Sequence, residues 1–120
     1  MSADIETRDY EFYVGTDYVR RLTLEEDGQP ISLTDYAAAM QLRSTLASDV
    51  AFEMTTENGR IAITPEAGQI DLIFRSGETV FVKPGRYLYD LELKAPDDTI
   101  VRLMAGTITF YAEVTRIDSA

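Results

Sequence analysis

The alternation of apolar and polar residues with a period of two is the feature that most constrains this chain. In the clearest case, over residues 107–114, the apolar positions are Ile108, Phe110, Ala112 and Val114. The same alternation runs through residues 69–75 and 86–94. Because successive side chains of a β-strand point to opposite faces of its sheet, each segment is predicted to be a strand with one buried and one solvated face. The period near 3.6 that a helix requires does not dominate anywhere.

Turn-forming residues divide the chain into short strands. Asp27-Gly28 followed by Pro30, Asn58-Gly59, Pro84-Gly85 and Pro96-Asp97-Asp98 separate the apolar runs, and Gly106 is expected at a bulge or bend. We predict strands near residues 9–15, 18–25, 37–43, 50–55, 60–64, 69–75, 86–94, 99–104 and 107–115. Residues 33–36 are expected to form a single turn, and residues 76–82 a loop or one short helical turn.

Eight or nine short strands at this spacing indicate a β-sandwich or a barrel. Of the two, we predict an all-β antiparallel sandwich of the Ig-like kind, with at most one short helical turn. The length of 120 residues suits one domain, and a hydrophobic content of 45% is enough for a core. We place that domain at residues 9–116, between a flexible N-terminal arm of residues 1–8 and a flexible C-terminal tail of residues 117–120, because both ends are polar.

Composition excludes several classes of chemistry. The chain has neither histidine nor cysteine, so it has no Ser-His-Asp triad, thiolate nucleophile, disulfide or zinc site. With 21 acidic against 11 basic residues and a net charge of -10, it lacks the concentrated basic surface that nucleic acid or an anionic membrane requires. The densest basic pair, Arg20-Arg21, is expected to point to opposite faces of its strand. No apolar run is long enough to span a membrane.

Carboxylates are the remaining acid–base groups. Asp90 and Glu92 share one strand face, and Asp35 and Asp71 form a second candidate pair, so either could be weighed as a glycosidase pair. The alternative is a solvated strand face, which we favour because 21 acids in 120 residues bring some pairs together by chance. We therefore expect no enzymatic activity and no cofactor.

Two acidic turns, at residues 25–28 and 97–99, raise the question of calcium binding. Neither turn matches the spacing of a calcium loop, and Asp and Asn are the usual residues of ordinary turns. We expect no metal site.

Aromatic and apolar residues offer candidate contacts with other molecules. Near the N-terminus, Tyr10, Phe12 and Val14 are expected in the core, which leaves Tyr13 exposed as a partner anchor or as part of a sugar-stacking platform. Four further residues lie on the polar side of their own strands and would form an apolar contact patch if those strands are neighbours; the alternative is that they cover sheet edges. These four are Ile73, Leu88, Met104 and Tyr111.

An ordered series of short motifs is more specific than any single residue. In chain order it reads GTDYVRRLTL (15–24), DGQPISLTDY (27–36), AMQLR (39–43), NGRI (58–61), GQI (68–70), PGRYLYDL (84–91) and RLMAGTI (102–108). This series resembles a group of small bacteriophage and prophage β-sandwich proteins, and it is similar to the N-terminal domain of the upper baseplate proteins of long-tailed phages. The likeness covers residues 14–116. One departure is Asp35, where relatives often have glycine before the tyrosine.

The resemblance implies a non-enzymatic structural role in a virion, as a protein–protein adaptor at the tail, baseplate or neck. Its partners would be other phage virion proteins, with multiple copies in a symmetric assembly. Contacts are expected from the loops at residues 47–50 and 78–83, from exposed sheet edges, and from the N-terminal arm, including Asp4, Ile5 and Glu6. A capsid decoration protein and a carbohydrate-binding module are the alternatives.

Overall fold

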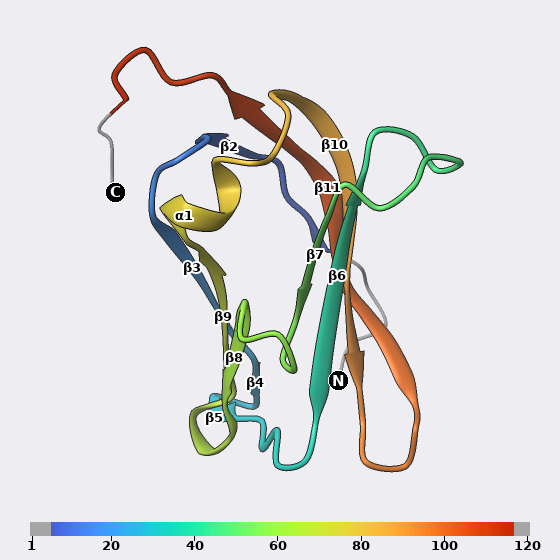
Figure 1. The fold of residues 1–120 in the computed structure, drawn as a ribbon. Coiled ribbons are helices and arrows are strands. Elements are labelled where there is room, and N and C mark those ends of the chain that lie inside the picture. Colours follow the sequence, from blue (N-terminus) through green and yellow to red (C-terminus); the bar gives the residue numbers. More distant parts are fainter. Residues whose placement is uncertain (1–5, 117–120) are drawn as a thin grey trace.

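The computed structural model describes residues 6–116 and folds them into two packed β-sheets (Figure 1). The smaller sheet has the order β3 (Tyr18–Thr23), β9 (Gln69–Phe74), β8 (Ile61–Thr64). In the larger sheet β11 (Ile100–Tyr111) lies beside β10 (Gly85–Lys94), followed by β6 (Ala37–Arg43) and β7 (Phe52–Thr55). Two short strands, β1 (Glu6–Thr7) and β2 (Tyr10–Tyr13), pair in parallel with the other side of β11, and the other pairings are antiparallel.

The strand order confirms the predicted Ig-like sandwich. An Ig sandwich of the variable type places strands G, F, C and C′ in one sheet and strands B, E and D in the other. Here β11, β10, β6 and β7 occupy the first set of positions, and β3, β9 and β8 the second. Outside the two sheets lie the hairpin of β4 (Glu25–Glu26) and β5 (Gln29–Pro30), the 3-10 turn η1 (Pro65–Ala67) and the single helical turn α1 (Ser76–Thr79).

The core fills the space between the sheets, as the alternation predicts. Phe12 on β2 packs against Phe74 on β9 with ring centroids 4.5 Å apart, and against Phe110 on β11 at 5.9 Å. Phe12 and Val14 are buried, whereas Tyr13 is 54% exposed, as the alternation predicts.

A β-bulge corrects the prediction for Met104. The segments predicted at 99–104 and 107–115 form one continuous strand, β11, whose register against β10 shifts between the pairs Leu91–Met104 and Glu92–Arg102. The extra residue, Leu103, turns the following side chain to the opposite face. Met104 is therefore fully buried and is not available as a contact residue.

Part of the N-terminal arm predicted at residues 1–8 belongs to the larger sheet. Residues 6–8 pair with β11, where the Arg8 amide donates to the Ala105 carbonyl over 3.0 Å. Next to it, Oδ1 of Asp9 accepts from the backbone amide and the hydroxyl of Thr107, at 2.9 and 3.0 Å. A Cβ atom on Gly106 would collide with the Arg8 carbonyl oxygen, so glycine is needed for this close approach rather than for a break in the strand. The rest of the arm, with Asp4 and Ile5, and the predicted tail at 117–120 lie outside the described residues.

Left-handed backbone conformations occur in several of the predicted turns. Asp27 and Gly28 have φ values of 52° and 77° and join β4 to β5. Asp35 has a φ of 62° in the turn at residues 33–36, so an aspartate here adopts the conformation for which glycine is usually chosen.

Two tyrosines of β10 anchor backbone segments outside their own strand. The Tyr87 hydroxyl donates to the Lys83 carbonyl, four residues upstream, which is the type of contact that forms the tyrosine corner of Ig-like domains. The Tyr89 hydroxyl donates to the Arg8 carbonyl at 2.8 Å and so fixes the N-terminal strand. Burial raises the pKa of both phenols above the ordinary value of 10.0, more strongly for Tyr89.

These shifts predict a loss of stability in alkali. A phenol whose pKa is higher in the folded state than in the unfolded state binds its proton more tightly when folded. Its contribution to stability is therefore complete below about pH 10 and declines as the pH rises above that value. We expect the free energy of unfolding, measured by urea denaturation, to fall between pH 9.5 and 11.5, and to fall less steeply in Tyr89→Phe. Equal slopes for the two proteins would contradict this assignment.

The close approach at Gly106 predicts a destabilised Gly106→Ala variant. The added methyl must displace the Arg8 carbonyl or push β2 away from β11, so we expect a loss of about 1–3 kcal/mol in the free energy of unfolding. Gly77→Ala is the matched control, because a Cβ at Gly77 meets nothing within 4 Å. Urea denaturation of both variants measures the difference, and an unchanged Gly106→Ala would refute the steric argument.

Candidate functional site

Three of the four carboxylates considered for catalysis are engaged in ordinary surface contacts, and the fourth, Asp35, is exposed. Arg102 binds both Asp90, at 2.9 Å, and Glu92, at 3.1 Å. Asp71 accepts two hydrogen bonds from Arg21, at 2.7 and 3.0 Å. This pairing also puts Arg21 on the outer face of its sheet, whereas Arg20 lies over the Phe12 ring on the inner side, as predicted.

The acidic turn at residues 97–99 is held by local hydrogen bonds. Asp97 accepts a hydrogen bond from the Thr99 amide at 3.0 Å. Hydrogen bonds with the Thr99 side chain and then with its amide lower the pKa of the Asp97 carboxyl group. Across residues 6–116, no three acidic side chains are grouped so that they could hold a metal ion. No helix in this part of the chain is long and apolar enough to cross a membrane.

The predicted apolar patch is divided by the fold. Ile73 lies on β9 and Leu88 on β10, so their outward-facing side chains are on opposite faces of the sandwich. Tyr111 instead meets Tyr13, with ring centroids 5.7 Å apart, and both side chains are exposed. The rings are tilted by 44° and so do not form a flat platform for a sugar.

Polar contacts occupy two residues near these strands. The Tyr111 hydroxyl donates to Glu11 at 2.7 Å. Glu6, the described member of the arm candidates, binds Arg8 at 2.8 Å. The outer face of β2 and β11 therefore combines exposed aromatic rings with carboxylates.

Two loops gather exposed apolar side chains at one end of the sandwich. We call the open cavity between them, of about 490 Å³, the end hollow; its lining includes Val50, Phe52, Glu78, Phe81 and Val82. The loops predicted as contacts at residues 47–50 and 78–83 both border it.

The individual apolar residues of these loops were not predicted as contacts. Phe81 is 87% exposed, and smaller fractions of Val50 and Val80 are also exposed. Leu46, which precedes the first loop and does not line the end hollow, is 85% exposed. A signal for such contact residues was present in the sequence, because these large apolar side chains lie in segments flanked by polar and turn-forming residues.

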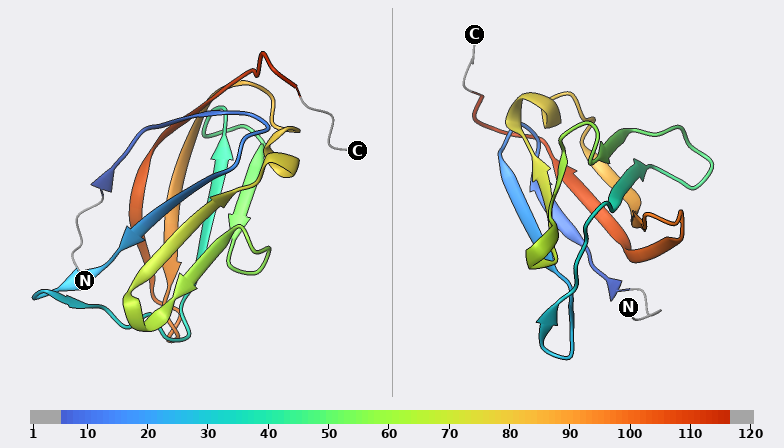
Figure 2. Two further views of the ribbon diagram at one scale, coloured as in Figure 1. Left: turned by 90° about the vertical axis from the view of Figure 1, so that its left-hand side faces the viewer. Right: turned by 90° about the horizontal axis from the view of Figure 1, so that it is seen from below.

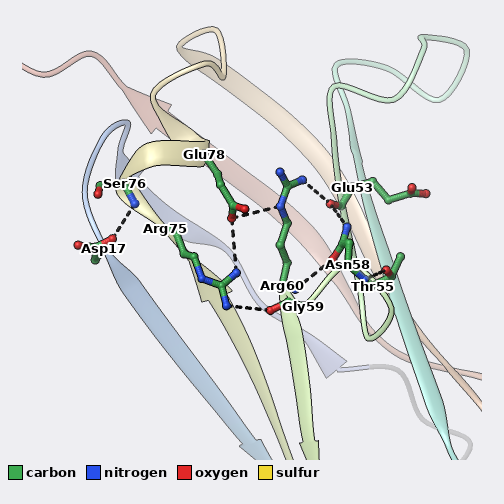
Figure 3. A network of polar contacts seen from close by, with 9 residues as sticks. All are labelled: Asp17, Glu53, Thr55, Asn58, Gly59, Arg60, Arg75, Ser76 and Glu78. Carbon is green, nitrogen blue, oxygen red and sulfur yellow. Dashed lines mark hydrogen bonds and ion pairs between the residues drawn. The ribbon is translucent and has the colours of Figure 1, made fainter. Parts of the chain in front are cut away.

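A small ionic network forms one wall of the end hollow (Figure 3). The Glu78 carboxylate, on α1, forms ion pairs with Arg60 at 3.2 Å and with Arg75 at 3.6 Å. Its buried Oε1 has no hydrogen-bond partner among the described residues, so these two ion pairs compensate the charge. The Arg60 guanidinium also lies 4.3 Å from the centre of the Phe52 ring, and it thereby joins the two sheets at this end.

The same network covers the free edge of β7. The Glu53 carbonyl accepts from Asn58 at 3.0 Å and from Arg60 at 2.8 Å. The side-chain oxygen of Asn58 accepts from the Thr55 amide at 2.9 Å. Unpaired edge groups attract strands of other chains, so these side chains protect the edge.

Comparisons with known proteins establish no family. No protein-family model and no curated protein matches the chain. Among solved structures, it is similar to a chain of the crystal structure of ICOS in complex with ICOS-L and an anti ICOS-L VNAR domain. That match has 12% sequence identity and a TM-score of 0.47, and it covers 91% of this chain and 56% of the other. The Ig-like assignment rests on the strand order described above.

Removing Arg60 is predicted to destabilise the end of the sandwich. In Arg60→Leu, Glu78 loses one of its two ion pairs and the Glu53 carbonyl loses a donor, so we expect a loss of about 1–3 kcal/mol in the free energy of unfolding. The uncovered β7 edge should also increase aggregation, measured by light scattering. Arg21→Leu is the control, because its ion pair with Asp71 is at the surface, and we expect a much smaller effect. Equal losses in the two variants would contradict a special role for Arg60.

Proposed function

We propose that this protein is a non-enzymatic structural component of a bacteriophage particle, acting in multiple copies as a protein–protein adaptor at the tail, baseplate or neck. The phage setting is supported by the ordered motif series between residues 15 and 108. The adaptor role is supported by one structural observation, the exposed apolar side chains on the two loops beside the end hollow.

Physical reasoning connects this end of the molecule to binding. Single exposed apolar residues are common on protein surfaces, but a group of them beside a concavity is typical of a contact with another chain. Phe81 can enter a pocket of a partner and remove most of its exposed area from water, which favours association. The end hollow beside it can receive an apolar side chain in return, since Phe52 and Val82 line it.

Two alternatives differ from the adaptor, one in its binding surface and the other in its place in the particle. A carbohydrate-binding module stacks sugars on aromatic rings, and the tilted Tyr13–Tyr111 pair is poorly shaped for this. A capsid decoration protein would use the same apolar contact but would be distributed over the capsid lattice.

The proposal predicts that Phe81 and Val50, which line the end hollow, are needed for incorporation into particles. In phage particles assembled with a tagged chain, we expect electron microscopy to show the label at the tail, baseplate or neck. The double variant Phe81→Ser, Val50→Ser should be folded by circular dichroism but depleted from purified particles at least tenfold. Val114→Ser is the control, because Val114 is 98% exposed and does not line the end hollow.

Label over the capsid lattice would replace the tail assignment with decoration. Absence of the wild-type chain from particles, or equal incorporation of the double variant, would overturn the proposal.

A further inference from the structure

The two sides of the sandwich differ in whether side chains occupy the outward backbone groups of the edge strands. On one side, β7 lies over β8, and the outward backbone groups of Glu53 and Thr55 are occupied by Asn58 and Arg60. On the other side, β2 lies over β3, as shown by the Phe12 and Tyr18 rings, whose centroids are 4.6 Å apart. Figure 2 shows this second side, along which β2 and β3 run in opposite directions.

The edge of β1 and β2 is largely open. The amides of Arg8 and Val14 donate to β11, each over 3.0 Å. The backbone N–H and C=O groups of the even-numbered residues between them therefore point toward that strand. The backbone groups of Thr7, Asp9 and Glu11 consequently point away from the sheet. Within residues 6–116, one amide on this free edge has a partner, that of Tyr13, which donates to the Tyr18 hydroxyl at 3.2 Å.

The edge of β3 is open in the same way. The Leu24 amide donates to the Gly68 carbonyl at 2.8 Å, so the backbone groups of the even-numbered residues of β3 point toward β9. The backbone groups of Arg21 and Thr23 point outward and have no partner within residues 6–116. At Val19, the carbonyl accepts from the Arg20 guanidinium at 3.0 Å, while its side chain is 54% exposed.

The two open edges carry opposite charges. The β1–β2 segment contributes Glu6, Asp9 and Glu11 against one arginine, which is already paired with Glu6. β3 has no acid of its own and contributes Arg20, which lies over the Phe12 ring, and Arg21, which is already paired with Asp71 of β9. An acidic edge with free backbone groups and a basic edge with free backbone groups are complementary, and each copy of the chain presents both on one side.

We propose that two copies of this chain associate side by side, each adding its β1–β2 edge to β3 of the other. A two-fold axis parallel to the strands brings each acidic edge against a basic edge and forms the contact twice. Because β2 and β3 run in opposite directions within one copy, the new pairs are antiparallel. This dimer deepens the proposed multimeric adaptor and rests on it for its place in a particle.

Sedimentation equilibrium of the purified full chain tests the dimer. We expect a monomer–dimer equilibrium over micromolar to millimolar concentrations. Glu11→Pro and Thr23→Pro each remove one outward amide from an edge strand. Because the edge contact forms twice in the dimer, each variant loses two hydrogen-bond donors and should raise the dissociation constant about tenfold or more. Glu53→Pro is the matched control, since its amide points outward on the opposite side and it should leave the constant unchanged.

A second pair of variants keeps the backbone intact in case the prolines impair folding. Arg21→Glu should weaken the dimer, whereas Lys94→Glu makes the same charge change away from both edges and should have less effect. A monomer at all concentrations, or a dimer equally sensitive to edge and control variants, would overturn the inference. This assay needs no particle and leaves Phe81 intact. A result that overturns the dimer is therefore distinguishable from one that overturns the adaptor proposal.

Discussion

The contact between three phenylalanine rings is the interaction on which the rest of the structure depends. Phe12 comes from β2, Phe74 from β9 and Phe110 from β11, so one cluster joins the smaller sheet to the larger one. Phe12 can reach this position because β2 pairs with β11. That pairing in turn requires the close approach of Arg8 to Gly106. The N-terminal strand β2 is therefore a part of the core.

Local alternation was sufficient to predict most strands. The segment at residues 37–43 was placed with the bounds that β6 has, because it lies between two regular neighbours and its side chains alternate without interruption. The prediction for Met104 was wrong because the bulge at Leu103 depends on the register against β10, which a local pattern does not contain. Residues 6–7 were missed as a strand because they contribute backbone pairing to the sheet and both of their side chains are exposed.

The site could be predicted only in outline, for a similar reason. The loops at residues 47–50 and 78–83 were expected to make contacts, but only the fold brings them to one hollow. Ile73 and Leu88 follow the predicted alternation on their own strands, yet they belong to different sheets. Alternation assigns each side chain to a face of its strand, whereas strand order decides which faces become neighbours.

The two sides of the sandwich differ in whether their edge strands can pair with another strand. Arg60 compensates Glu78, covers Phe52 and occupies the Glu53 carbonyl, so one side of the sandwich is closed to further strands by the residue that also lines the end hollow. The opposite side has free backbone groups and complementary charges. On the arrangement proposed above, pairing of two copies along that side leaves both end hollows uncovered, because the hollow lies against the closed edge. Each copy can then hold its neighbour through backbone pairing and a different protein through apolar side chains, and an adaptor requires two such independent surfaces.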